Sequence, residues 1–202
     1  MAKLVAWWKV KDSVSGYSPD IIVATSYGSL DSALTVGSEV CFRSAIALSQ
    51  SVGGTSIAFS NSAKNGGPYS PDFEFAHKLR IMRDHTMLGF PIDLCLARPF
   101  RGAIDEMMVI CDCILARKVQ PRSVVVITGS ILSPLALKVY SNLLPKVEIT
   151  IVTVPYEVEV QSSSPYFFRR GLVRWFVGNI VMRLALEFFS MRLVATFFRD
   201  MF

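Results

Sequence analysis

The chain has 202 residues, enough for one domain with a substantial hydrophobic core. Only 18% of the residues are charged, against roughly 25% in a typical soluble domain. This indicates that surface is covered by a partner or a membrane, or that a doubly wound sheet buries much apolar material. The net charge is +5, but most of the excess lies in residues 165–202, where arginines alternate with apolar residues. No exposed basic stripe results, so we expect no nucleic-acid partner.

Five short apolar runs follow an N-terminal lead, residues 1–19, and each run ends in a polar or glycine-containing turn before a helix-like stretch. The runs are Asp20–Ala24, Ser56–Ser60, Ile92–Leu96, Ser123–Thr128 and Val147–Thr153. Continuous Ile/Val/Leu runs are typical of strands buried on both faces, and helical crossovers between them imply a parallel sheet. The sequence therefore predicts an α/β fold for residues 20–161, a Rossmann-like three-layer sandwich with a mainly parallel five-stranded sheet.

Helices are predicted between these strands from apolar positions that recur at helical spacing. The predicted ranges are Ser38–Val52, Pro71–Leu88, Ala103–Arg117 and Pro134–Leu144. Ser38 is the expected N-cap of the first helix, since a serine hydroxyl can accept from a free backbone N–H there. Gly89-Phe90-Pro91 ends the second helix, as a glycine followed by proline commonly does.

Residues 162–202 are predicted to be a basic, aromatic C-terminal helical segment behind a polar hinge at Ser162–Pro165. It reads as one long helix, or as two helices broken near Gly171 and Gly178. Apolar residues surround it instead of forming one stripe, which is typical of a helix buried on several sides. Either it packs on the sheet, or it docks onto a partner or a membrane interface, with arginines reaching back to water. Three phenylalanines near the end favour docking.

The cysteines and histidines do not predict a metal site or a disulfide. Cys111 and Cys113 are two residues apart on a predicted helix, so they point to different faces and cannot share an ion. We expect all four cysteines, which include Cys41 and Cys95, to behave as small buried hydrophobes. His77 and His85 have no acid or cysteine at ligand spacing. We therefore expect no metal and no cofactor.

Several short motifs occur in a characteristic order along the chain. They are Asp20-Ile-Ile-Val, Arg43 with Ala47 and Leu48, Ser60, Glu74, Gly89-Phe90-Pro91, Val126-Ile127-Thr128 and Ala185-Leu186-Glu187. This order resembles the YdcF/SanA/ElyC family, Rossmann-like domains linked to envelope biology in bacteria, from Asp20 to about Phe198. The resemblance implies the same α/β fold and a site at the strand ends.

The departures from the family pattern concern that site. Thr25-Ser26-Tyr27 stand where the family usually has glycines, Asn61-Ser62 replace its Gly-Gly, and Gly102-Ala103 replace its Asn-Thr. Leu132 and Leu135 occupy the positions of its histidine and arginine. A leucine can neither carry a proton nor pair with a phosphate or a carboxylate. The resemblance therefore implies a pseudoenzyme, a member with no catalytic residues.

A residual ligand pocket is still expected, because ligands of such sheets bind beyond the carboxyl ends of the strands. Its candidate residues are Ser26, Gly28, Arg43, Ser60, Asn61, Glu74, Glu106 and Thr128. Glu74 could form an acidic cluster with Asp105 or Glu106, with Arg43, Arg98 or Arg101 as anion partners. Alternatively, these acids only complement helix dipoles in the first turns. The long loop Asn61–Gly67 is the best place for a ligand held by loop amides.

Two functions remain open. The first is a non-catalytic accessory or scaffold subunit, whose protein partners belong to a membrane-associated multiprotein assembly, with a membrane surface contact through residues 165–202. The second is a small-molecule or nucleotide-binding enzyme acting through the strand-end pocket. The apolar stretch of residues 1–14 is too short for a signal peptide, and no run of 18 apolar residues predicts a transmembrane helix. We expect an intracellular, membrane-associated location; a mitochondrial one is compatible, but no residue establishes it.

Overall fold

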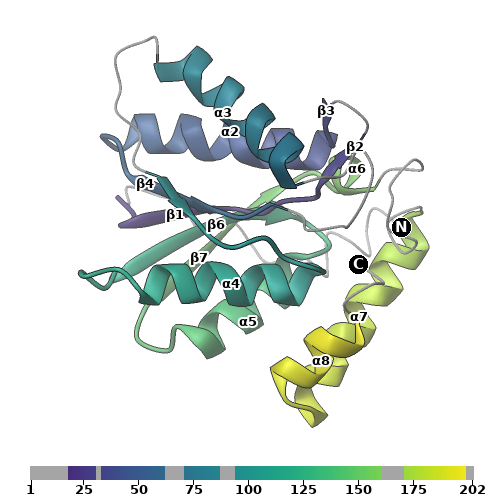
Figure 1. Ribbon diagram of the computed structural model, residues 1–202. Coiled ribbons are helices and arrows are strands. Elements are labelled where there is room, and N and C mark those ends of the chain that lie inside the picture. The colour runs from purple at the N-terminus through teal and green to yellow at the C-terminus, as the bar shows by residue number, and fades with distance from the viewer. Residues whose placement is uncertain (1–17, 31–32, 62–70, 87–93, 161–170, 199–202) are drawn as a thin grey trace.

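The computed structural model describes residues 18–30, 33–61, 71–86, 94–160 and 171–198. Its centre is a five-stranded parallel sheet with the strand order β5-β4-β1-β6-β7 (Figure 1). The strands are β1 (Ile21–Ala24), β4 (Ser56–Phe59), β5 (Leu94–Leu96), β6 (Ser123–Gly129) and β7 (Glu148–Val154). The predicted Rossmann-like α/β fold is confirmed, and each predicted apolar run overlaps one of these strands.

Helices cover both faces of the sheet and make the three layers (Figure 1). One layer holds α2 (Val36–Ser51) and α3 (Pro71–Thr86), and the other holds α4 (Ala103–Leu115) and α5 (Ser133–Leu143). The remaining elements are a small antiparallel hairpin of β2 (Ser29–Leu30) and β3 (Ala33–Leu34), the short helix α6 (Tyr156–Glu159), and the C-terminal helices α7 (Leu172–Phe188) and α8 (Met191–Phe197). The C-terminal pair extends the second layer, since α7 contacts α5 and α8 contacts α4.

The core lies around β1 and β6, the two strands at the centre of the sheet. Every residue of both strands is buried. Ile22 of β1 pairs with Ile57 on one side and Val125 on the other, so three β-branched side chains line up across one face of the sheet. Branched side chains pack well on a pleated surface that helices cover on both sides, which explains why these runs form strands.

The first helix begins earlier than predicted. α2 starts at Val36, and its N-cap is Thr35, whose side chain accepts from the Ser38 backbone N–H at 3.3 Å. Ser38 lies inside the first turn and has another task. Its hydroxyl donates to the Gly28 carbonyl at 2.8 Å and accepts from the Tyr27 N–H at 2.7 Å. This serine therefore fixes the loop that follows β1.

The C-terminal segment forms two helices, but their junction is not at the predicted glycines. α7 begins directly after Gly171 and passes through Gly178, which is buried. The two helices are separated at Ser190, which caps the N-terminus of α8: its hydroxyl accepts from the Leu193 N–H at 3.4 Å. A glycine inside a helix costs only about 1 kcal/mol, so packing of the buried face keeps α7 intact. No helix among the described residues has both the length and the apolar character to cross a membrane.

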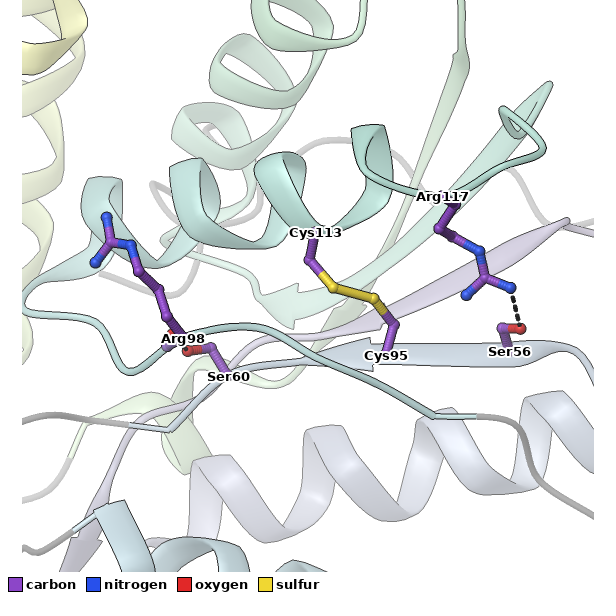
Figure 2. Close-up of a disulfide and its surroundings, with 6 residues drawn as sticks. All are labelled: Ser56, Ser60, Cys95, Arg98, Cys113 and Arg117. Atoms are coloured by element: carbon purple, nitrogen blue, oxygen red, sulfur yellow. Dashed lines mark hydrogen bonds between the residues drawn. A yellow bond between two sulfur atoms is a disulfide. The ribbon is translucent and has the colours of Figure 1, made fainter.

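The expectation that all cysteines are free was wrong. Cys95 on β5 and Cys113 on α4 form a disulfide, whereas Cys41 and Cys111 are free and buried (Figure 2). Helix geometry explains the difference: α4 turns Cys113 toward the edge strand and Cys111 into the core. Burial, with Asp112 nearby, raises the pKa of Cys111 to about 12, so this thiol stays protonated. The crosslink ties the edge strand β5 to the helix beneath it.

Reducing this disulfide should destabilise the fold measurably. The two cysteines are 18 residues apart, and closing a loop of about 15 residues stabilises a protein by roughly 3 kcal/mol. We expect the Cys113→Ser variant to lose about that much free energy of unfolding in a urea titration. Reductant should lower the stability of the natural chain and leave the variant unchanged. Equal stability of the natural chain with and without reductant would contradict the crosslink.

Candidate functional site

The expected ligand crevice lies between the carboxyl ends of β1 and β6. These strands are neighbours, but the helices that follow them, α2 and α5, cover opposite faces of the sheet (Figure 1). Such a topological switch point opens a crevice in which doubly wound sheets bind their ligands. The residues Thr25–Gly28 and Gly129–Leu132 should therefore hold any ligand.

The side chain of Tyr27 fills this crevice. Its ring is 2% exposed, and its hydroxyl accepts from the Gly129 N–H at 2.8 Å. The same oxygen lies 3.4 Å from the Thr128 hydroxyl and donates to Glu159 at 3.4 Å. Burial, and next the nearby Glu159, raises the pKa of Tyr27 well above its ordinary value, so the phenol stays protonated. It acts as a neutral bridge between the two strand-end loops.

Glu159, the last residue of α6, occupies the position of a bound anion. Its carboxylate accepts from the backbone N–H groups of Ile131 at 2.8 Å and Leu132 at 3.2 Å, at the start of α5. Free N–H groups at a helix N-terminus attract anions, and here the chain supplies the anion itself. The Trp175 indole of α7 donates to the same carboxylate at 3.1 Å. Glu159 thus joins the sheet edge to the C-terminal helices.

Gly129 leaves the space that this carboxylate needs. A Cβ on Gly129 would lie 1.8 Å from Cδ of Glu159, well inside any allowed contact distance. Only glycine therefore fits at the end of β6 while Glu159 is in place. Glu159 and Trp175 were not among the predicted site residues, because neither lies in a sequence motif that would have identified it.

A second polar cluster lies beside the first, beyond β1 and β4, and contains both predicted acids. The Ser26 N–H donates to Glu106 at 2.5 Å, and the Ser26 hydroxyl donates to Glu74. The two glutamates come from α3 and α4, on opposite faces of the sheet, and both are buried. Glu74 and Glu106 therefore meet at Ser26, which corresponds to the first of the two alternatives for these acids.

Lys78 neutralises part of this cluster and was missed as a site residue. Its ammonium lies 2.8 Å from the Glu74 carboxylate and donates to the Ser60 carbonyl at 2.7 Å and to Asn61 Oδ1 at 3.2 Å. Its side chain is 1% exposed and lies near the Phe59 ring. The helical spacing of Glu74 and Lys78, four residues apart, was the available signal. Lysine side chains are mostly exposed in proteins, so this spacing by itself did not predict a buried ion pair.

The other candidate residues do not all join these clusters. Arg43 is exposed on α2 and pairs with Glu39 at 2.7 Å, away from the strand ends. The Ser60 hydroxyl donates to the Arg98 carbonyl at 2.5 Å, so it fixes the loop after β5. Gly28 adopts a positive φ of 79°, which lets the chain turn after β1. Of the loop Asn61–Gly67, only Asn61 lies among the described residues.

Asp105 and Glu106 separate into different roles although they are adjacent in sequence. Asp105 accepts from the Arg101 N–H at 2.7 Å and pairs with Arg98 at 3.1 Å, at the partly exposed start of α4. Its negative charge lies in the first turn of α4 and complements the helix dipole, which is the second of the two alternatives for these acids. Glu106, one residue further round the helix, points into the strand-end cluster.

Neither a histidine nor an arginine stands at the two positions where the family resemblance would place them. Leu132 and Leu135 are buried in the core, and the loops Thr25–Gly28 and Ser130–Leu132 contain no histidine. His77 and His85 are half-buried on α3. Among the residues that the structure describes, no group of three or more His, Cys, Asp and Glu could hold a metal ion.

No family model, curated protein or solved structure matches the chain. The resemblance to the YdcF/SanA/ElyC family therefore stays a prediction that depends on the order of the sequence motifs.

Proposed function

We propose that this protein is a non-catalytic accessory or scaffold subunit. In this proposal, the α/β domain docks through α7 and α8 onto a membrane-associated multiprotein assembly. The observation that carries the proposal is the outward face of α7, which is apolar where a surface helix is normally polar. The filled strand-end crevice supports the non-catalytic part.

The outward face of α7 has five large apolar side chains that the domain leaves uncovered. They are Val173, Val177, Val181, Leu184 and Phe188, and each is between 45% and 80% exposed. At about 100° per residue they fall within one narrow arc of the helix. The opposite face, which includes Trp175 and Met182, is buried against the domain. We call this row of five residues the α7 stripe.

Single exposed apolar residues are common, but a continuous row is not. Contiguous exposed apolar surface typically marks a contact with a protein or a membrane. The apolar surface continues onto α8, where Leu193 and Phe197 are also exposed. A contact that covers the α7 stripe would explain the low share of charged residues in the chain.

The strand-end clusters support a non-catalytic function. Tyr27 and Glu159 occupy the volume and the helix amides that a ligand would need. Glu74 and Lys78 are paired with one another. The alternative, a small-molecule or nucleotide-binding enzyme, has one supporting observation: two glutamates and a lysine are buried together at the strand ends, where sheets of this kind bind their ligands.

We expect a Leu184→Glu variant to lose its partners without losing its fold. Leu184 is 56% exposed, so a charge there should leave unfolding nearly unchanged, while a charge buried in an interface costs several kcal/mol and would weaken association at least tenfold. The measurement is gentle affinity purification of the tagged chain from native membranes, with the mass and composition of the recovered complex.

The matched control is Val119→Glu, which places the same charge at an apolar residue beyond the far end of α4 that is 80% exposed, more than Leu184. This control should co-purify with the same subunits as the natural chain. If the natural chain is recovered as a free monomer, or if Leu184→Glu retains the complex, the docking function is wrong. In that case, nucleotide binding that is lost in Glu74→Ala would establish the alternative.

A further inference from the structure

A groove that contains three arginines lies between the loop after β5 and helix α8. Its volume is about 320 Å³, and it is lined by Arg98, Arg101, Asp105, Met108, Arg192, Ala195 and Thr196. We call it the arginine groove. Because α8 packs on α4, residues nearly 100 positions apart in the sequence meet there. The predicted C-terminal basic segment therefore contributes its charge to a defined concave surface.

The arginine groove has an excess of positive charge. Asp105, the only acid among the described residues of its lining, pairs with Arg98 at 3.1 Å and accepts from the Arg101 backbone N–H. Among the described residues, no acidic side chain pairs with the guanidinium of Arg101 or of Arg192. Guanidinium groups bind phosphate through two parallel hydrogen bonds and are less strongly hydrated than ammonium groups. The groove is thus suited to a phosphate-bearing anion.

A second groove lies on the other flank of α8 and is entirely apolar. Its volume is about 310 Å³, and it is lined by Ala185, Phe189, Leu193, Val194, Phe197 and Phe198. We call it the apolar groove. Arg192 and Leu193 are consecutive residues of α8 and face the two different grooves, as the helical turn of about 100° per residue requires. One short helix therefore separates a cationic site from an apolar one.

From these two grooves we infer that the C-terminal helices bind an anionic phospholipid at a membrane surface. The arginine groove receives the phosphate of the headgroup, and the apolar groove with the α7 stripe contacts the acyl chains. A free phosphate would use only the arginine groove. An amphiphile whose charged and apolar parts are joined matches both grooves together. This inference rests on the proposed docking surface and names one of its ligands.

The energetics suit a peripheral contact. Each arginine near an anionic membrane surface strengthens binding about fivefold, and salt screens the attraction. Exposed apolar side chains such as Leu193 and Phe197 add to this by leaving water. A second basic cleft, lined by Asp20, Arg117, Lys118 and Arg122 among others, provides an internal comparison because its described lining includes no residue of the C-terminal helices. Figure 2 shows Arg98 near the start of α4 and Arg117 just after its end, on either side of the disulfide.

The test is co-sedimentation of the purified full chain with two kinds of vesicle, phosphatidylcholine alone and equal parts of phosphatidylcholine and phosphatidylserine. We expect binding to the anionic vesicles, decreasing with salt. Arg101→Ala and Arg192→Ala should each weaken that binding about fivefold. Leu193→Ser with Phe197→Ser should weaken it as well. Lys118→Ala, in the second basic cleft, should bind like the natural chain.

Three results would overturn the inference: no binding to anionic vesicles, equal binding by the arginine variants and the natural chain, or equal loss in Lys118→Ala. A soluble competitor, glycerol 3-phosphate, separates a lipid from a free phosphate. If it displaces the vesicles fully and the Leu193/Phe197 variant binds normally, the ligand is a free phosphate and the lipid inference is wrong. If the chain does not bind vesicles but is recovered in a native complex, the phospholipid inference is wrong and the proposed assembly stands. If it binds vesicles but is recovered without other subunits, the proposed assembly is wrong and the phospholipid inference stands.

Discussion

Replacing Glu159 with alanine is expected to destabilise the fold by about 3–5 kcal/mol. The carboxylate accepts from two backbone N–H groups at the start of α5 and from the Trp175 indole, all of them buried. Each buried donor that loses its acceptor costs about 1–3 kcal/mol. The alanine also opens a cavity between α5, α6 and α7. Urea unfolding followed by tryptophan fluorescence measures the loss directly.

Two further variants separate charge from size at this position. Glu159→Gln keeps the shape and one accepting oxygen, so it should lose clearly less stability than Glu159→Ala. Glu157→Ala, an exposed acid on the same short helix, should stay within about 0.5 kcal/mol of the natural chain. If Glu159→Ala unfolds at the same urea concentration as Glu157→Ala, the carboxylate is not the anchor that the geometry indicates.

Replacing Lys78 with methionine should cost a similar amount, for a different reason. Methionine fills much of the lysine volume, but it removes the ammonium that lies 2.8 Å from the buried Glu74 carboxylate. Removing one member of a buried ion pair typically costs 3–5 kcal/mol, because the other charge is then buried unpaired. The Ser60 carbonyl and Asn61 also lose a donor. Equilibrium unfolding in urea gives the change in free energy.

A double variant decides whether the pairing itself matters. Glu74→Gln in the Lys78→Met background removes the unpaired charge, so it should restore most of the lost stability. The pair Arg43 and Glu39 is the control, since both side chains are about half exposed. Arg43→Met should cost less than about 1 kcal/mol, as exposed pairs do. If Glu74→Gln adds a further loss to Lys78→Met, the buried pair is not coupled as the structure indicates.

Both predictions concern residues at which this fold usually binds a ligand. A Rossmann-like sheet leaves free amides and a crevice at its switch point. In this chain Glu159 and Tyr27 occupy them, and the neighbouring acids are paired internally. Buried ionised groups need partners wherever they lie, so the same side chains could hold a structure together or hold a ligand. The stability variants measure the first of these roles, and the purification from native membranes tests the function that we propose.

The order of the elements was readable from the sequence because it depends on local pattern. Runs such as Ser123–Thr128 are continuous and β-branched, which only a strand covered on both faces accommodates. The periodic segments between the strands indicated helices α2 to α5 to within a few residues. The sequence left open whether Glu74 and Glu106 meet at the strand ends or only complement helix dipoles.

Only the tertiary structure decided which side chains are partners. The Cys95–Cys113 crosslink, the burial of Lys78 and the position of Glu159 depend on the crossing of helices over the sheet. Ile131 and Glu159 are 28 residues apart, and no local periodicity relates them. The sequence showed apolar residues all round the segment that contains α7, and which of them stay exposed depended on how the helix packs. Sequence pattern sets local conformation, whereas distant contacts are chosen by the packing of the whole chain.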